Sequence, residues 1–167
     1  EGLILNTGIS LSNKDNLERI LDSASFDAIQ LPINILDNKE IRLGLVRKMS
    51  DLGIIVFVRS IYLQGLFFQK PEMLKNTKLA AAAPLVERIQ QVARQEGMTT
   101  AQLALSFIRD TEGVDSLVIG SETAIQAANN IELMNTPVLS RKTRENLLSD
   151  FESVDPFVIS PWEWDKR

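Results

Sequence analysis

A run of polar side chains closes an apolar segment near the middle of the sequence, "VFVRSIYLQGLF" at residues 56–67. Arg59 and Ser60 follow five consecutive apolar residues, and Tyr62 and Gln64 come soon after them. A guanidinium group, two hydroxyls and an amide can together hold a polar or phosphate-bearing ligand. Because the functional groups of parallel α/β folds stand at the carboxyl ends of the strands, this segment predicts a buried strand that ends in a ligand site.

Three other apolar segments end in side chains of the same kind. None of these ends brings two carboxylates together, which disfavours a paired acid–base mechanism. The sequence contains no His, so a hydrolase triad of Ser, His and Asp is excluded, and no catalytic residue is assigned in this chain. Taken together, the four strand ends carry Ser10; Gln30 and Asn34; Arg59, Ser60 and Tyr62; and Gly120, Ser121, Glu122 and Thr123.

Several of these residues also have a purely structural interpretation. Gln30 interrupts an apolar strand, where an unpaired amide would cost about 1–3 kcal/mol, so a functional role is favoured for it. Ser10 and Ser121 suit caps at strand–helix turns equally well, and Arg59 suits a buried ion pair equally well. Residue type alone favours a surface or turn role for Asn129, Asn130 and Gly65, although a glycine turn can also present its amides to phosphate.

The bulk composition restricts the class of protein. The chain has 167 residues, which suits one domain spanning 1–167. Its net charge of −4 and the lack of a basic run argue against nucleic-acid binding. Since Cys and His are both absent, disulfides are excluded and no metal site is expected.

The sequence shows no targeting or membrane signal. No apolar run approaches the roughly 20 residues of a membrane span, and no signal-peptide pattern is visible. We therefore expect a cytoplasmic protein without a membrane partner. The sequence starts with Glu1-Gly2 and leads almost at once into a strand-like run, so we expect a fragment of a longer chain.

Apolar runs and turn signals predict strands that alternate with helices. The helix signals include capping residues at Ser12, Thr99 and Ser140 and a glycine stop at Gly53. Strands are expected at 2–10, 26–36, 54–60 and 114–121, and helices at 17–24, 41–52, 80–96, 100–110, 124–134 and 141–151, followed by an irregular tail.

This order implies parallel βαβ units with right-handed crossovers. Two folds are compatible with it: an open, doubly wound sheet, or a (βα)8 barrel of which four units would be half. No turn carries the G-x-G-x-x-G phosphate fingerprint, which makes a Rossmann domain the weaker alternative.

The chain resembles the C-terminal half of an aldo-keto reductase, from the fifth barrel strand to the end. The resemblance covers nearly all 167 residues and depends on the order and spacing of several segments. It implies half of a (β/α)8 TIM barrel, with four parallel strands, helices on the outer face, and a C-terminal helix and tail. The segments are "GISLS", "FDAIQLPINILD", "VFVRSIYLQGLF", "GMTTAQLALSFIRDTEGVDSLVIGS" and "VDSLVIGSETAIQAANNIELM".

The resemblance implies a nicotinamide cofactor, NADP or NAD. Ser10 and Gln30 would hold the carboxamide, and Arg59 stands where members of the family often stack a Tyr on the nicotinamide ring. A flat guanidinium can also stack. The loop that wraps the pyrophosphate would be formed by Ser60, Tyr62, Gln64 and Gly65.

The last strand and the helix after it match the adenosine end of the family's site. Members that use NADP often have a cation near Gly120 and another near Gln126, and this sequence has neither, so the choice between NADP and NAD stays open. Ile33 replaces a common Tyr, while Asn34 is retained. By resemblance, the ribose and adenine contacts fall to Gly120, Ser121, Glu122, Thr123, Gln126, Asn129 and Asn130.

The intact enzyme implied by the resemblance reduces a small carbonyl substrate to an alcohol, with hydride from NAD(P)H and a proton from a Tyr. The family's catalytic Asp, Tyr, Lys and His lie on the first four barrel strands, which this chain does not match. We therefore expect this chain alone to be inactive. Two alternatives stay open: a noncatalytic, reductase-like protein-interaction module, and an unrelated α/β domain whose polar strand ends are only caps.

Four parallel strands cannot close a barrel. They leave two edges with unpaired backbone groups and an inner face that a complete barrel would fill. We expect this face to expose Leu, Ile and Val over more than a few hundred Å², and we expect a homodimer through the half-barrel edges.

Overall fold

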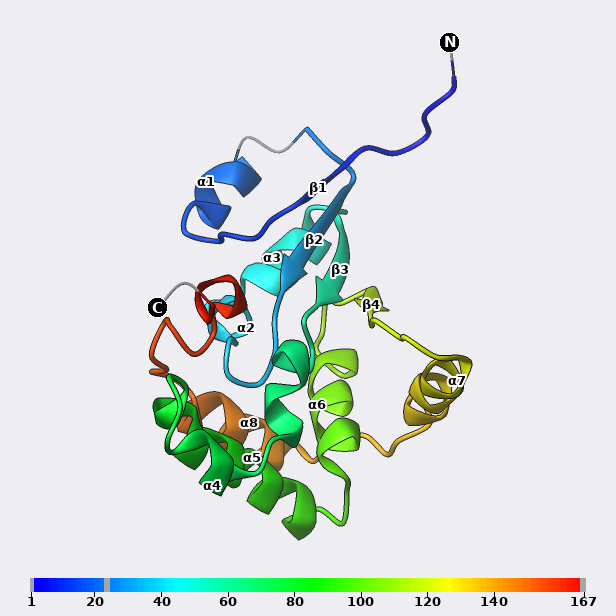
Figure 1. Cartoon of the computed structure of the whole chain (residues 1–167). Coiled ribbons are helices and arrows are strands. Elements are labelled where there is room, and N and C mark those ends of the chain that lie inside the picture. The colour runs from blue at the N-terminus through cyan, green and yellow to red at the C-terminus, as the bar shows by residue number, and fades with distance from the viewer. Residues whose placement is uncertain (1, 23–24, 166–167) are drawn as a thin grey trace.

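A single sheet of four parallel strands organises the computed structural model, which describes residues 2–22 and 25–165 (Figure 1). The strands are β1 (Gly8–Ser10), β2 (Ala28–Pro32), β3 (Ile55–Arg59) and β4 (Ser116–Val118). Their order in the sheet is the order in the sequence, β1-β2-β3-β4, and all three pairings are parallel. A doubly wound sheet reverses its strand order at a switch point, so this sequential order belongs to an arc of a barrel. The predicted α/β fold with four parallel strands is confirmed.

Helices fill the connections between the strands. After β1 comes α1 (Leu17–Asp22), and after β2 come α2 (Lys39–Arg42) and α3 (Leu45–Asp51). The long connection from β3 to β4 holds the 3₁₀ helix η1 (Leu63–Phe68), α4 (Pro71–Leu74), the 3₁₀ helix η2 (Ala80–Ala82), α5 (Ala83–Gln95) and α6 (Thr100–Arg109). Beyond β4 lie α7 (Ala124–Leu133), α8 (Arg141–Asp150) and the 3₁₀ helix η3 (Pro161–Glu163).

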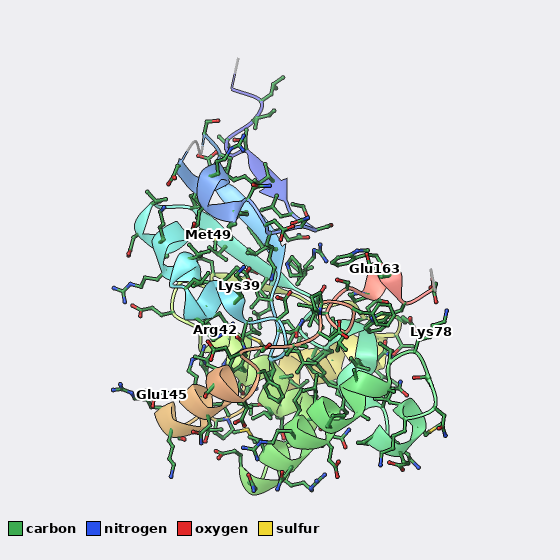
Figure 2. All side chains as sticks on the ribbon, turned by 90° about the vertical axis from the view of Figure 1, so that its left-hand side faces the viewer. Lys39, Arg42, Met49, Lys78, Glu145 and Glu163 are labelled. Atoms are coloured by element: carbon green, nitrogen blue, oxygen red, sulfur yellow. The ribbon has the colours of Figure 1, made fainter. Side chains whose placement is uncertain are left out.

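The core lies on one face of the sheet. Successive strand residues point to opposite faces, and the set Ile29, Leu31, Val56 and Val58 is fully buried. Met49 on α3 is fully buried as well (Figure 2). At about 25 cal/mol per Å² of buried apolar surface, these side chains contribute most of what holds the layers together.

The opposite face carries polar and apolar residues together, so the expected exposure of Ile and Val is observed there at two positions, while the expected area stays a prediction. Parallel register aligns one row of residues across the whole sheet on this face: Ser10, Gln30, Phe57 and Ser116. Ile55 and Val118 add apolar surface, at 37% and 41% exposure. The fully buried apolar strand residues face the helices, because strand alternation assigns each side chain to one face only.

Two predicted helices differ from those observed. The helix predicted at 41–52 is divided in two, because Gly44 adopts a left-handed φ of 69° between α2 and α3. The helix predicted at 17–24 begins at Leu17 as predicted and runs to Asp22, but the capping signal at Ser12 lies upstream of it, and the Ser12 hydroxyl accepts a hydrogen bond from Arg59. Residues 23–24 of that predicted helix lie outside the described residues.

The capping predictions for the later helices are confirmed. Thr99 caps α6 through a capping box with Gln102, and the Ser140 hydroxyl accepts from the backbone N–H of Thr143 at the start of α8. The C-terminal segment runs irregularly across the surface, as predicted. Arg42 on α2 forms an ion pair with Glu152, just after α8, at 3.2 Å.

Helix α7 packs loosely against the rest of the fold. It lies to one side of the sheet, beyond β4, and none of its residues is buried (Figure 1). Ile125 and Ile131 on this helix are 74% and 69% exposed. No helix in the described ranges is long and apolar enough to cross a membrane.

Candidate functional site

A cavity of about 820 Å³ opens at the carboxyl ends of β3 and β4. Its walls are the loop after β3, the N-terminal end of α6, and the loop after β4 with one side of α7. Apolar contributions come from Phe68, Ala101 and Leu133, among others. The residues predicted from the sequence that line it are Ser60, Tyr62, Gln64, Gly65, Gly120, Ser121, Glu122, Gln126, Asn129 and Asn130.

The loop after β3 has an unusual backbone. Ser60, Leu63 and Gln64 all have positive φ, at 63°, 45° and 53°, and Gly65 follows at 80°. A non-glycine residue in this region costs on the order of 1 kcal/mol, so such residues persist only where the surrounding structure holds them. Here Leu63, Leu66 and Phe67 are buried and anchor the loop, which leaves its polar side chains and amides at the cavity.

Tyr62 brings an unpaired hydroxyl to this loop. Its oxygen is buried and has no hydrogen-bond partner within the described part of the chain. Burial raises the pKa of Tyr62 from 10.0 to about 12, so the phenol is neutral at physiological pH. The ring packs against Phe68 with 5.3 Å between centroids. The hydroxyl is therefore a neutral group with unused hydrogen-bonding capacity beside the cavity.

The loop after β4 is shaped by the start of α7. Oε1 of Gln126 accepts from the backbone N–H groups of Glu122 and Thr123, at 2.7 and 3.2 Å. In return, Oγ1 of Thr123 accepts from the N–H of Gln126. Thr123 is not among the residues that line the cavity, so its observed role is to cap the helix. Deeper in α7, Nδ2 of Asn130 donates to the hydroxyl of Ser121 at 3.0 Å.

The remaining predicted residues lie on the neighbouring strands. Oγ of Ser10 donates to Oε1 of Gln30 at 3.3 Å. Arg59 donates to the hydroxyls of Ser60 and Ser12, each at 3.2 Å, and to the carbonyl of Leu11 at 3.1 Å. The guanidinium thus joins the loop after β1 to the end of β3 through neutral oxygens, in place of the ion pair that was one alternative.

The model of the Aldo/keto reductase family matches residues 1–147 of this chain. The chain belongs to the aldo/keto reductase family. "Protein tas" of Escherichia coli (strain K12) and of Shigella flexneri are each 26% identical to it over 170 residues, covering 92% of this chain and 45% of theirs. The chain therefore spans about half the length of the curated relatives it matches.

Solved structures of this family have the same fold. Aldo-keto reductase AKR11C1 from Bacillus halodurans, in apo and holo forms, superposes with a TM-score of 0.69 at 16% identity. The alignment with its apo form covers 91% of this chain and 53% of that one. The glycerol dehydrogenase AKR11B4 from Gluconobacter oxydans superposes with a TM-score of 0.59 at 17% identity, and the alignment covers 89% of this chain and 51% of that one. At these identities the likeness concerns the fold.

A second, smaller cavity of about 110 Å³ lies beside the first in this aldo/keto reductase chain. It shares Ser60 and Gln64 with the large cavity and is closed from the other side by Trp162 of the C-terminal segment. Asn34, only 1% exposed, lines it. Its Oδ1 accepts from the N–H groups of Leu36 and Asp37, while its Nδ2 has no partner in the part of the chain that the structure describes.

A buried charge cluster supports this rim, and sequence reasoning missed it. Nζ of Lys14 lies 2.7 Å from Asp37 and 2.6 Å from Glu40, and it also donates to the carbonyl of Pro32 at 3.0 Å. Burial raises the pKa of Asp37, while the Lys14 ammonium opposes that shift. The only signal in the sequence was an acidic residue near a predicted helix start, which reads as an ordinary cap.

Within residues 2–22 and 25–165, no group of three or more Asp or Glu side chains could hold a metal ion. The large cavity, the loop after β3 and the start of α7 together form the candidate site.

Proposed function

We propose that this chain forms the cofactor-binding half of an aldo-keto reductase, an NAD(P)H-dependent oxidoreductase that reduces carbonyl compounds to alcohols. One observation carries the proposal. Polar residues that the sequence predicts at the ends of separate strands line a single cavity at the carboxyl ends of β3 and β4. Membership of the aldo/keto reductase family supports it.

The residues present fit a dinucleotide. A Cβ added at Gly65 or Gly120 would meet nothing within 4 Å, so the backbone at both glycines borders open space that a ligand can approach. Tyr62 adds an unpaired hydroxyl. A volume of about 820 Å³ lies within the usual range for cofactor sites, about 300–1,000 Å³.

Each part of the site would hold a different part of the cofactor. On the strands, the hydrogen bond from Ser10 occupies Oε1 of Gln30, which leaves Nε2 of Gln30 to donate to the carboxamide oxygen. The loop with Ser60 and Gly65 would hold the diphosphate with its amides, and α7 would hold the adenosine. When bound, the nicotinamide would supply the hydride for a carbonyl carbon.

The proposal places the proton donor outside this chain. Tyr62 lies in the loop assigned to the diphosphate, and its raised pKa makes it a poor acid. The remaining ionisable side chain that lines the large cavity is Glu122. We propose that a further set of barrel strands, which pairs with the free edges of β1 and β4, supplies the catalytic acid. The chain alone would then bind cofactor without reducing a carbonyl compound.

Binding of NADH and NADPH to the 167-residue chain tests the proposal. Each dinucleotide would be titrated with the wild-type chain, with Ala101→Trp and with Ala81→Trp, and binding would be followed by the fluorescence of the dinucleotide. Ala101 lines the cavity, so an indole there is expected to weaken binding at least tenfold. Ala81 is exposed on η2, away from the cavity-lining residues, and its Trp variant is the size-matched control. A wild-type chain that binds neither dinucleotide would refute the proposed function.

A further inference from the structure

The adenosine end of the proposed site has an unusual charge distribution. Glu122 is the one charged side chain among the residues that line the 820 Å³ cavity. A shallower cavity of about 580 Å³ adjoins it along α7, and the charged residue lining that one is Glu132. Both cavities share Phe68, Ala101 and Asn129. Across the described residues that line them, the two cavities thus carry carboxylates and no cation.

A cation beside this end of the cavity, Arg109, already has partners of its own. Arg109 lines a separate cavity of about 340 Å³, which touches the first through Ile119 and Asn130. Its guanidinium donates to both carboxylate oxygens of Asp110 and to the carbonyls of Met134 and Thr136. An arginine held in this way is not available to pair with a ligand phosphate without breaking several charge-assisted hydrogen bonds.

The N-terminus of α7 could attract an anion at this end of the cavity. A helix dipole places roughly half a positive charge there. However, the capping box already uses the N–H groups of Glu122, Thr123 and Gln126. The Glu122 carboxylate, a full negative charge, directly precedes the cap. The balance at this end of the cavity is therefore negative.

We propose that the site accepts NAD(H) and discriminates against NADP(H), with Glu122 as the specificity-determining residue. This inference rests on the proposed function and adds the choice of cofactor to it. A 2′-phosphate carries between one and two negative charges and needs a cationic partner, which these walls do not supply. A free ribose 2′-hydroxyl, in contrast, can donate to a carboxylate such as that of Glu122.

Two pairs of ligands isolate the effect of the 2′-phosphate. NADH and NADPH would be titrated into the chain, followed by 5′-AMP and adenosine 2′,5′-bisphosphate as competitors. Within each pair the molecules differ only in the 2′-phosphate. NADH is expected to bind at least tenfold more tightly than NADPH, and 5′-AMP should show a similar advantage over the bisphosphate.

A charge reversal tests the residue. Glu122→Lys is expected to shift the NADH/NADPH affinity ratio at least tenfold toward NADPH. The side chain of Glu122 is exposed, and the observed bond of this residue to Gln126 uses its backbone N–H, so the fold should be unaffected. Glu87→Lys, at an exposed position of α5, makes the same change in net charge away from the cavity and should leave the ratio unchanged.

The outcomes separate the two proposals. If neither dinucleotide binds, the proposed function is wrong and the cofactor choice falls with it. If both bind and NADPH binds as tightly as NADH or more tightly, only the preference for NAD(H) is overturned. If NADH is preferred but Glu122→Lys and Glu87→Lys give the same ratio, the assignment of the preference to Glu122 is overturned.

Discussion

The hydroxyl of Ser10 donates a hydrogen bond to Oε1 of Gln30, 3.3 Å away on the neighbouring strand. The two residues are register partners in the parallel pairing of β1 with β2, so the contact follows directly from the sheet. Gln30 is thereby satisfied on one side and keeps its two amide hydrogens for another acceptor. A residue that interrupts an apolar strand is held in one orientation with its donor unused, which suits the recognition of a carboxamide.

This arrangement predicts a selective loss of binding in Gln30→Met, which keeps the length of the side chain and removes its donor. We expect NADH affinity to fall severalfold while 5′-AMP affinity stays the same, because Gln30 is assigned to the nicotinamide end only. The free energy of unfolding should change by about 1 kcal/mol or less, since the amide is only half-buried. Titration calorimetry with both ligands checks this. An equal loss for NADH and 5′-AMP would show that Gln30 acts through the fold.

Two capping boxes of the same type predict different consequences of the same mutation. Thr99 caps α6, whose residues 103–108 are all buried, and Thr123 caps α7, which buries none. Thr99→Ala should therefore lower global stability by about 1 kcal/mol in urea unfolding. Thr123→Ala should leave the global free energy of unfolding nearly unchanged. It should speed amide hydrogen exchange within α7 and weaken dinucleotide binding. Equal global losses in both variants would mean that α7 is coupled to the core.

The sequence was sufficient to predict the strands and their order of alternation with helices, because buried parallel strands read as apolar runs. It did not predict strand length. The run 2–10 was expected to be a strand, yet β1 covers only Gly8–Ser10, since the N-terminal segment before it extends away from the sheet (Figure 1). A strand exists only where a neighbour pairs with it, and that is not visible in the strand's own residues.

The same limit applies to the site. Residues near strand ends could be predicted as a group, because parallel topology brings those ends to one rim. The contact between Lys14 and Glu40 could not be predicted, because it joins residues 26 positions apart and both side chains resemble ordinary surface charges in the sequence. The capping role of Thr123 was missed because ligand contact and helix capping use the same residue types.

Tyr62 gives a direct spectroscopic test of the loop, because it is the one tyrosine in the sequence. Its pKa is raised to about 12 by burial. Phenolate absorbance near 295 nm should therefore rise with a midpoint near pH 12 in the folded chain and near pH 10.0 in denaturant. The unfolded state loses this proton first, so stability should fall as pH rises between those values, and Tyr62→Phe should remove that part of the fall. A midpoint near pH 10 in the folded chain would contradict the observed burial.

The charge cluster under the rim predicts a large, pH-dependent effect of Lys14→Met. Removing the ammonium leaves Asp37 and Glu40 buried without a counter-charge, which should cost about 3–5 kcal/mol in the free energy of unfolding at pH 7. Without Lys14, burial and the neighbouring Glu40 carboxylate raise the pKa of Asp37 further, so its carboxyl takes up a proton more readily in the folded state than in the unfolded state. The stability contributed by that proton is present at low pH and is lost as pH rises through the folded pKa, so the deficit of the variant should shrink when unfolding is measured at pH 5.

Lys48→Met is the matched control for this measurement. Lys48 also forms a lysine–carboxylate pair, at 3.0 Å from Asp22, but both side chains are substantially exposed. Solvent screening reduces the contribution of such a pair to at most about 1 kcal/mol, so its loss should be small and nearly independent of pH. If the two variants lose equal stability, or if the Lys14→Met deficit is the same at pH 5 and pH 7, then the cluster is solvated in solution and does not act as a buried support of the site.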